Sequence, residues 1–105
     1  MARLRLTRAA RTDLRSIHSQ SEEMFGLVQA DAYATGLTKA LRLIADYPRA
    51  GRLRTDTKIP VRTQPYKSHV IVYGSGDDEV VILRVRHARE DWISDPEGQA
   101  PSDNQ

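Results

Sequence analysis

The chain has 105 residues, of which 39% are hydrophobic, so it can bury one modest core and we expect a single domain. The formal net charge is only +2, and the absence of cysteine excludes a disulfide framework and fits a reducing compartment, by default the cytoplasm. No apolar run of signal-peptide length opens the chain, and the longest strongly apolar run, Val80 to Leu83, is far too short to span a membrane.

The first predicted elements are a short strand and a helix. Residues 3–6 alternate polar and apolar side chains, as a half-buried strand does, and Thr7 stands where a helix N-cap belongs. The helix should end near Phe25, with Gly26 as the break. Its apolar stripe is expected to contain Ala10, Leu14, Ile17 and Met24.

A second helix is predicted from about Leu27 to Tyr47, because apolar residues keep the helical period until Pro48 stops it. Gly36 within it costs about 1 kcal/mol relative to alanine, and we expect close approach of the first helix to compensate. The two helices should form an antiparallel hairpin.

The rest of the chain predicts a loop, three strands and a tail. Residues 49–60 are polar, cationic and without a period, so a loop is expected there. Strands are predicted at residues 61–64, interrupted by Pro65, at 68–73 and at 79–87. Residues 95–105 lack an apolar anchor and predict a disordered tail after a domain of residues 1–94.

This order of elements predicts an α+β fold, with one mostly antiparallel sheet covered on one face by the helical hairpin. In the last strand, a period of two would turn Val81, Leu83, Val85 and His87 toward the helices. The other face would then stay open. It would carry Val80, Ile82, Arg84 and Arg86.

Two basic segments indicate an anionic or acidic partner. The residues expected to bind it are Arg52, Arg54, Lys58 and Arg62 in the middle of the chain and Val80, Ile82, Arg84, Arg86 and Arg89 near its end. Arg84 would need either a partner or an internal salt bridge, and the sequence leaves both open. A segment of the partner laid on the open face of the sheet would cover Val80 and Ile82.

The chain resembles the RelE/ParE toxin superfamily, and its ParE branch in particular. The resemblance lies in TRAARTDLRSI, GLVQADAYATGL, IADYPRAGR, SHVIVY and VILRVRHARED, which occur in family order. Arg86 departs from the pattern, where an apolar residue is usual. The resemblance implies a cytoplasmic toxin that inhibits DNA gyrase through protein–protein contact. It also implies a ParD-like ribbon-helix-helix antitoxin whose extended segment wraps the toxin.

The alternative within the superfamily is a RelE-like, ribosome-dependent mRNA endonuclease. RNA cleavage needs cations around the phosphate and groups that carry protons, for which Arg62, Arg84 and His87, or His69, are the candidates. The RelE-like pattern tends to place an aromatic hydroxyl close to the C-terminus, but the aromatic residue there is Trp92, which cannot serve as a general acid. This departure weakens the nuclease alternative.

For His87, a place at the edge of the core with a bond to a backbone carbonyl is favoured over catalysis, and His69 is expected to pack across strands. Three histidines without i, i+4 spacing predict no metal site, and no cofactor is implied. A third hypothesis, an accessory domain that binds nucleic acid directly, is less favoured than a protein partner.

Overall fold

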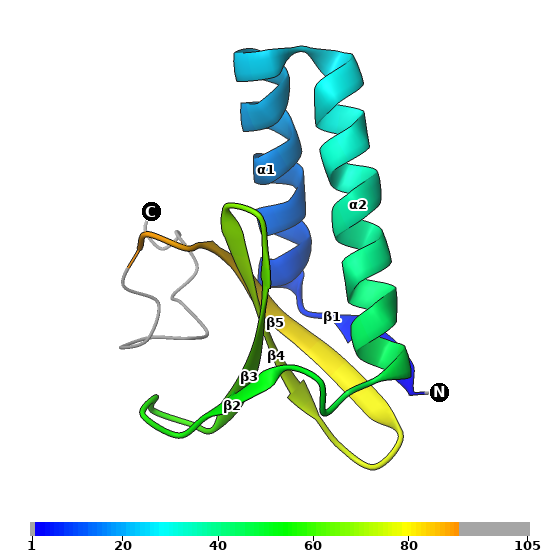
Figure 1. Ribbon diagram of the computed structural model, residues 1–105, viewed down its shortest axis with the longest axis vertical. Helices are drawn as coiled ribbons and strands as arrows, with labels where there is room; N and C mark the ends of the chain where they lie inside the picture. Colours follow the sequence, from blue (N-terminus) through cyan, green and yellow to red (C-terminus); the bar gives the residue numbers. More distant parts are fainter. Residues whose placement is uncertain (1, 91–105) are drawn as a thin grey trace.

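The computed structural model describes residues 2–90 and has an α+β fold with two helices and a five-stranded sheet. The elements are β1 (Arg3–Leu6), α1 (Arg8–Phe25), α2 (Leu27–Asp46), β2 (Arg52–Arg54), β3 (Val61–Tyr66), β4 (His69–Ser75) and β5 (Glu79–His87). The helices lie side by side as an antiparallel hairpin that projects beyond the sheet (Figure 1). Within the described chain, neither helix is long and apolar enough to cross a bilayer.

The strand order is β1-β5-β4-β3-β2, and the sheet is mostly antiparallel as predicted. Only β1 runs parallel to its neighbour, β5, with Arg3 opposite Glu79 and Leu6 opposite Ile82. The α1–α2 hairpin between β1 and the later strands provides the long connection that parallel pairing requires. β2 and β1 therefore form the two edges of the sheet.

Local signals define both ends of α1. The Thr7 hydroxyl accepts a hydrogen bond from the Ala10 amide at 3.0 Å, which confirms it as the N-cap. Gly26 has a φ of 90° and joins the two helices, as the sequence indicated. The prediction for Met24 is wrong, because its side chain is 71% exposed at the tip of the hairpin, above the sheet.

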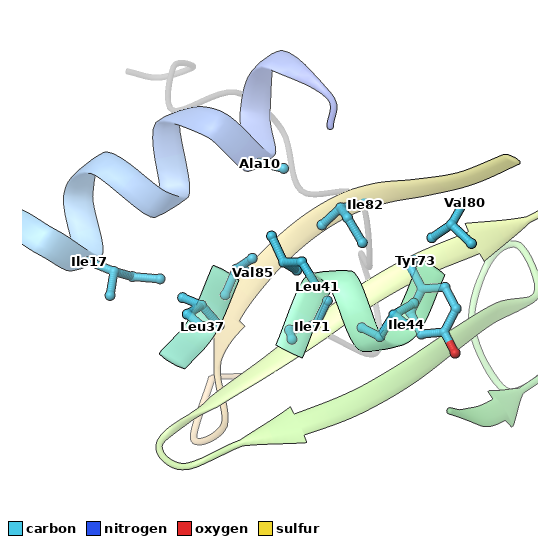
Figure 2. Packing of buried hydrophobic residues seen from close by; sticks show 10 residues of the cluster. All are labelled: Ala10, Ile17, Leu37, Leu41, Ile44, Ile71, Tyr73, Val80, Ile82 and Val85. Atoms are coloured by element: carbon cyan, nitrogen blue, oxygen red, sulfur yellow. The ribbon is translucent and has the colours of Figure 1, made fainter. Parts of the chain in front are cut away.

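The main core lies between the helical hairpin and the sheet (Figure 2). Its buried members come from α1, α2, β4 and β5, and they are Ala10, Ile17, Leu37, Leu41, Ile44, Ile71, Tyr73, Val80, Ile82 and Val85. On the opposite face Val61 and Val72 form a second, smaller cluster, against which Val70 and Leu83 pack.

Gly36 faces β3 and not α1, so the expected reason for this glycine is wrong. A Cβ at this position would overlap the hydroxyl of Tyr66. The Tyr66 ring also packs edge-on against Tyr33, with ring centroids 5.3 Å apart. The glycine therefore lets a tyrosine of the sheet lie directly against α2.

The predicted loop at residues 49–60 contains a strand, β2, which pairs with β3 from Arg52–Thr63 to Arg54–Val61. Pro65 does not interrupt β3, which continues to Tyr66. β2 does not extend alongside Pro65, so the missing proline N–H breaks no bond between these two strands. The bounds of β5 are confirmed as predicted.

Candidate interaction surface

Cations gather at the β2 edge of the sheet. Arg52 and Lys58 are exposed, and Leu53 between the two β2 arginines is 53% exposed. The Arg54 guanidinium bonds to Asp56 through Nε at 3.0 Å and Nη2 at 2.6 Å, and this contact lowers the pKa of Asp56. We call Arg52, Leu53, Arg54 and Lys58 the basic edge.

The segment that leads into the basic edge is fixed by side chains of the sheet. The Tyr73 hydroxyl donates to the Pro48 carbonyl at 2.8 Å and accepts from the Gly51 amide at 3.0 Å. Arg62 Nη1 donates to the carbonyls of Gly51 at 2.8 Å and Arg49 at 3.3 Å. Arg62, predicted as a binding residue, thus holds the loop that carries the basic edge.

Sequence reasoning missed Tyr73 as a positioning residue. Its side chain is fully buried, which raises the pKa of the phenol, and a Cβ at Gly51 would overlap its hydroxyl. The available signal was a tyrosine on the core face of a strand, because a buried tyrosine hydroxyl requires a hydrogen-bond partner.

Val80 and Ile82 do not lie on an open face, and this prediction is wrong. Both are fully buried in the main core (Figure 2). The cause is a β-bulge: Val72 is opposite Arg84 and Tyr73 is opposite Ile82, which leaves Leu83 as an extra residue in β5. The extra residue reverses the alternation, so Val80, Ile82 and Val85 all pack in the main core.

Arg84 is buried in an internal salt bridge, one of the two outcomes that the sequence left open. Its Nε and Nη2 lie 2.6 and 2.8 Å from the two carboxylate oxygens of Asp13 in α1. The side chains are 10% and 13% exposed. Asp13 also accepts a bond from the Val85 amide at 2.9 Å, so this carboxylate joins α1 to β5 just after the bulge.

Arg86 lies near the end of β5 and Arg89 two residues beyond it, and β5 is three strand positions from β2 in the order of the sheet. Arg86 forms a salt bridge with Glu90 at 2.9 Å, and this bond lowers the pKa of Glu90. Arg89 is exposed, and its amide donates to His87 Nδ1 at 3.1 Å. Of the predicted binding residues, Arg52, Arg54 and Lys58 lie in the basic edge, and Arg86 and Arg89 lie apart from it. Val80, Ile82 and Arg84 are buried.

A cluster of aromatic and imidazole rings lines a hollow of about 420 Å³ beside the tip of the hairpin. The Tyr33 hydroxyl lies 2.7 Å from His69 Nδ1, and the His69 and His87 rings are 5.5 Å apart. Burial, and then the neighbouring His87, lower the pKa of His69, while burial raises that of Tyr33. Lys67, with a φ of 51°, holds its ammonium over the Tyr33 ring at 5.6 Å.

His69 packs across strands with a hydrogen bond, as expected. The prediction for His87 was incorrect, because the ring is exposed and bonds to a backbone amide instead of a carbonyl. Arg62 and Arg84, its proposed partners in RNA cleavage, contact the 49–51 loop and α1. Between residues 2 and 90, no three His, Cys, Asp or Glu side chains are grouped so that they could hold a metal ion, and Trp92 lies outside the described residues.

Known proteins resemble this chain both in sequence and in fold. Residues 4–92 match the family model described as the ParE toxin of the type II toxin-antitoxin system parDE. Toxin ParE1 of Caulobacter vibrioides is 36% identical over 83 residues, which cover 79% of this chain and 85% of that protein. A solved structure, the chromosomal ParDE TA system from P. aeruginosa, matches with a TM-score of 0.70 at 23% identity, over 83% of this chain and 96% of that one.

Proposed function

This chain belongs to the ParE family of type II toxin–antitoxin systems, and from that premise we propose that it is the toxin of such a module and inhibits DNA gyrase by protein–protein contact. The observation that supports contact with a macromolecule is the basic edge, where cations and an exposed leucine flank the outer strand of the sheet. A gyrase-directed toxin acts in the cytoplasm. The proposal needs no cofactor and no bond-breaking step by this chain.

The same edge suits a neutralising antitoxin. We expect a ParD-like ribbon-helix-helix protein whose extended segment adds to β2 as a further strand. An edge strand presents backbone N–H and C=O groups to such a segment, and alternate side chains then supply specificity. Since Arg52 and Lys58 are exposed beside Leu53 and the 41% exposed Ile59, the segment should carry acidic and apolar residues.

Binding measurements with the antitoxin test the role of the basic edge. Arg52→Glu together with Lys58→Glu should weaken binding at least about tenfold, because two glutamates would replace the cations and repel the acidic segment. Arg11→Glu with Arg15→Glu on the exposed side of α1 makes the same charge change elsewhere and should leave affinity unchanged. If both double variants lose antitoxin affinity equally, the effect comes from net charge, and the proposal that the antitoxin binds the basic edge is wrong.

Three cell-free assays test the target. The purified chain should abolish ATP-dependent plasmid supercoiling by gyrase, leave ribosome-bound mRNA intact, and bind duplex DNA weakly at all salt concentrations. Phosphate contacts would instead cause a steep loss of duplex affinity as salt rises. Intact supercoiling with a folded, antitoxin-binding chain would refute the gyrase proposal.

The second candidate function is mRNA cleavage, and the Tyr33–His69–His87 cluster favours it. A histidine with a lowered pKa is neutral near pH 7 and can accept a proton from a ribose hydroxyl. If the parent chain cleaves mRNA and the His69→Ala and His87→Ala variants do not, this function is established. Gyrase inhibition that survives both substitutions would exclude a role for the cluster in the primary activity.

A further inference from the structure

One exposed stripe runs along α2, on the side of the helix away from the core. Its residues recur at spacings of four, three, four and four, and they are Val28, Ala32, Thr35, Lys39 and Leu43. We call this set the outer stripe. Its two apolar ends are unusually open, because Val28 is 87% exposed and Leu43 is 59% exposed. Ala32 and Thr35 in its middle are small, so another helix could approach closely there.

Both ends of the outer stripe continue into further apolar surface. Beyond Val28 lies the tip of the hairpin (Figure 1). Met24, Phe25 and Leu27 there are 71%, 58% and 54% exposed. Beside Leu43 a groove of about 450 Å³ opens between α2 and β3. Its lining includes Ala40, Ile44, Tyr47, Pro65 and Tyr66. Exposed apolar residues gathered in this way are typical of an interaction site.

The charges along α2 select the partner. Asp31 lies on one flank of the outer stripe near its start, and Arg42 lies on the same flank near its end. Asp31 is 63% exposed although it bonds to His18 at 2.8 Å, so it can accept another cation. Arg42 is exposed. A helix of the same sequence, laid antiparallel, would present the complementary charge at both positions.

The geometry points to a second copy of this chain as that helix. A two-fold axis at the level midway between residues 35 and 36 sets Val28 of each copy opposite Leu43 of the other, and Ala32 opposite the stem of Lys39. The same axis places the flank that carries Asp31 and Arg42 next to the same flank of the other copy. Asp31 of each copy therefore lies near Arg42 of the other. In a parallel pair the two-fold axis runs along the helices and brings unequal flanks together, so Asp31 and Arg42 of the two copies would lie on opposite sides of the contact and form no pair. We therefore propose that α2 mediates antiparallel, two-fold self-association.

The contact is small and the dimer is in concentration-dependent equilibrium. A helix of 20 residues is about 30 Å long, so one helix pair with its flanking tips reaches only the lower end of stable interface sizes. A dissociation constant in the micromolar range or weaker is expected. The proposal does not depend on gyrase inhibition, because it rests on α2 alone.

Charge exchange across the axis gives the first test, by sedimentation velocity of the full chain over a concentration series. Arg42→Asp alone places two acids in contact twice per dimer, and Asp31→Arg alone places two arginines in contact twice. Each should weaken self-association on the order of tenfold. An equimolar mixture of the two variants restores both opposite-charge pairs and should dimerise again. Arg11→Asp on α1 is the matched control and should dimerise like the parent chain.

Cross-linking gives the second test, because the chain contains no cysteine. Thr35→Cys places a thiol beside the proposed axis and should give a disulfide-linked dimer under mild oxidation, whereas Ser19→Cys on the exposed side of α1 should not. A chain that remains monomeric at several hundred micromolar overturns the proposal. So does a dimer that forms equally with either cysteine, or an outer stripe whose substitutions weaken antitoxin binding while self-association persists.

Discussion

Replacement of Asp13 by alanine should destabilise this protein more than any loss of a surface charge. The carboxylate accepts two bonds from Arg84 and one from the Val85 amide, at 2.6 to 2.9 Å, and only 13% of its side chain is exposed. Removing one partner of a buried ion pair leaves the other charge desolvated without its counterion. Such a change costs about 3–5 kcal/mol, a large share of a typical stability of about 5–15 kcal/mol.

Urea denaturation followed by circular dichroism, with linear extrapolation to water, measures this cost. Glu79→Ala is the matched control, because its salt bridge with Arg5 has a similar length, 2.8 Å, but side chains that are 36% and 58% exposed. That exposed pair should contribute less than about 1 kcal/mol.

A double-mutant cycle separates the pair from its surroundings. Since Asp13→Ala combined with Arg84→Ala removes both charges, it should cost less than the sum of the two single substitutions. If Asp13→Ala costs no more than Glu79→Ala, the Asp13–Arg84 contact is not a buried structural link between α1 and β5, and the present account of Arg84 is incorrect.

Three further predictions follow from the contacts around the core. Gly36→Ala should destabilise the fold by about 1–3 kcal/mol despite the better helix propensity of alanine, because its Cβ overlaps the Tyr66 hydroxyl, and the cost should fall in a Tyr66→Phe background. Tyr73→Phe should cost about 1–3 kcal/mol and accelerate hydrogen exchange of the Gly51 amide, which loses its acceptor. The lowered pKa of His69 means that the unfolded chain binds more protons just below the ordinary histidine pKa of 6.5, so stability should rise with pH through that window and level off above it.

Each of these predictions has a distinct contrary result. A stabilising Gly36→Ala substitution in the parent chain would mean that the Tyr66 ring moves away freely. Unchanged exchange at Gly51 in Tyr73→Phe would show that another acceptor holds the loop. Urea midpoints measured from pH 5 to pH 8 should be flatter for His69→Gln than for the parent, and equal slopes would remove His69 as the cause.

The helices were predictable from sequence because their signals are local. Thr7 caps α1 through its own hydroxyl, and Gly26 allows the positive φ of the link between the helices. The fold class also followed, since the order of elements leaves few ways to cover one sheet with one hairpin. Met24 was misassigned because the apolar period of α1 continues into its last turns, which project beyond the sheet and so have no core to pack against.

The open face of the sheet was mispredicted because a β-bulge has no signature in the sequence of β5. Residues 79–87 read as one regular strand, yet Leu83 has no partner opposite it in β4. One extra residue exchanges the two faces, so the period of two could not assign both halves of the strand correctly. Arg84 then meets Asp13, which lies 71 residues earlier in the chain, and no local pattern connects the two.

The segment that carries the basic edge has the composition of a loop, but part of its backbone is held by hydrogen bonds to the sheet. Residues 49–60 carry the polar, glycine-containing composition of a loop, but Tyr73 and Arg62 bind its first carbonyls and the Gly51 amide, and β2 pairs with β3. Residues 48–54 are therefore held by the fold itself, so a segment that pairs with β2 would order its own backbone but not that of the toxin. Under the proposed strand addition, a preformed toxin edge and an extended antitoxin segment would divide the cost of ordering unequally, and loss of the antitoxin would leave the toxin folded.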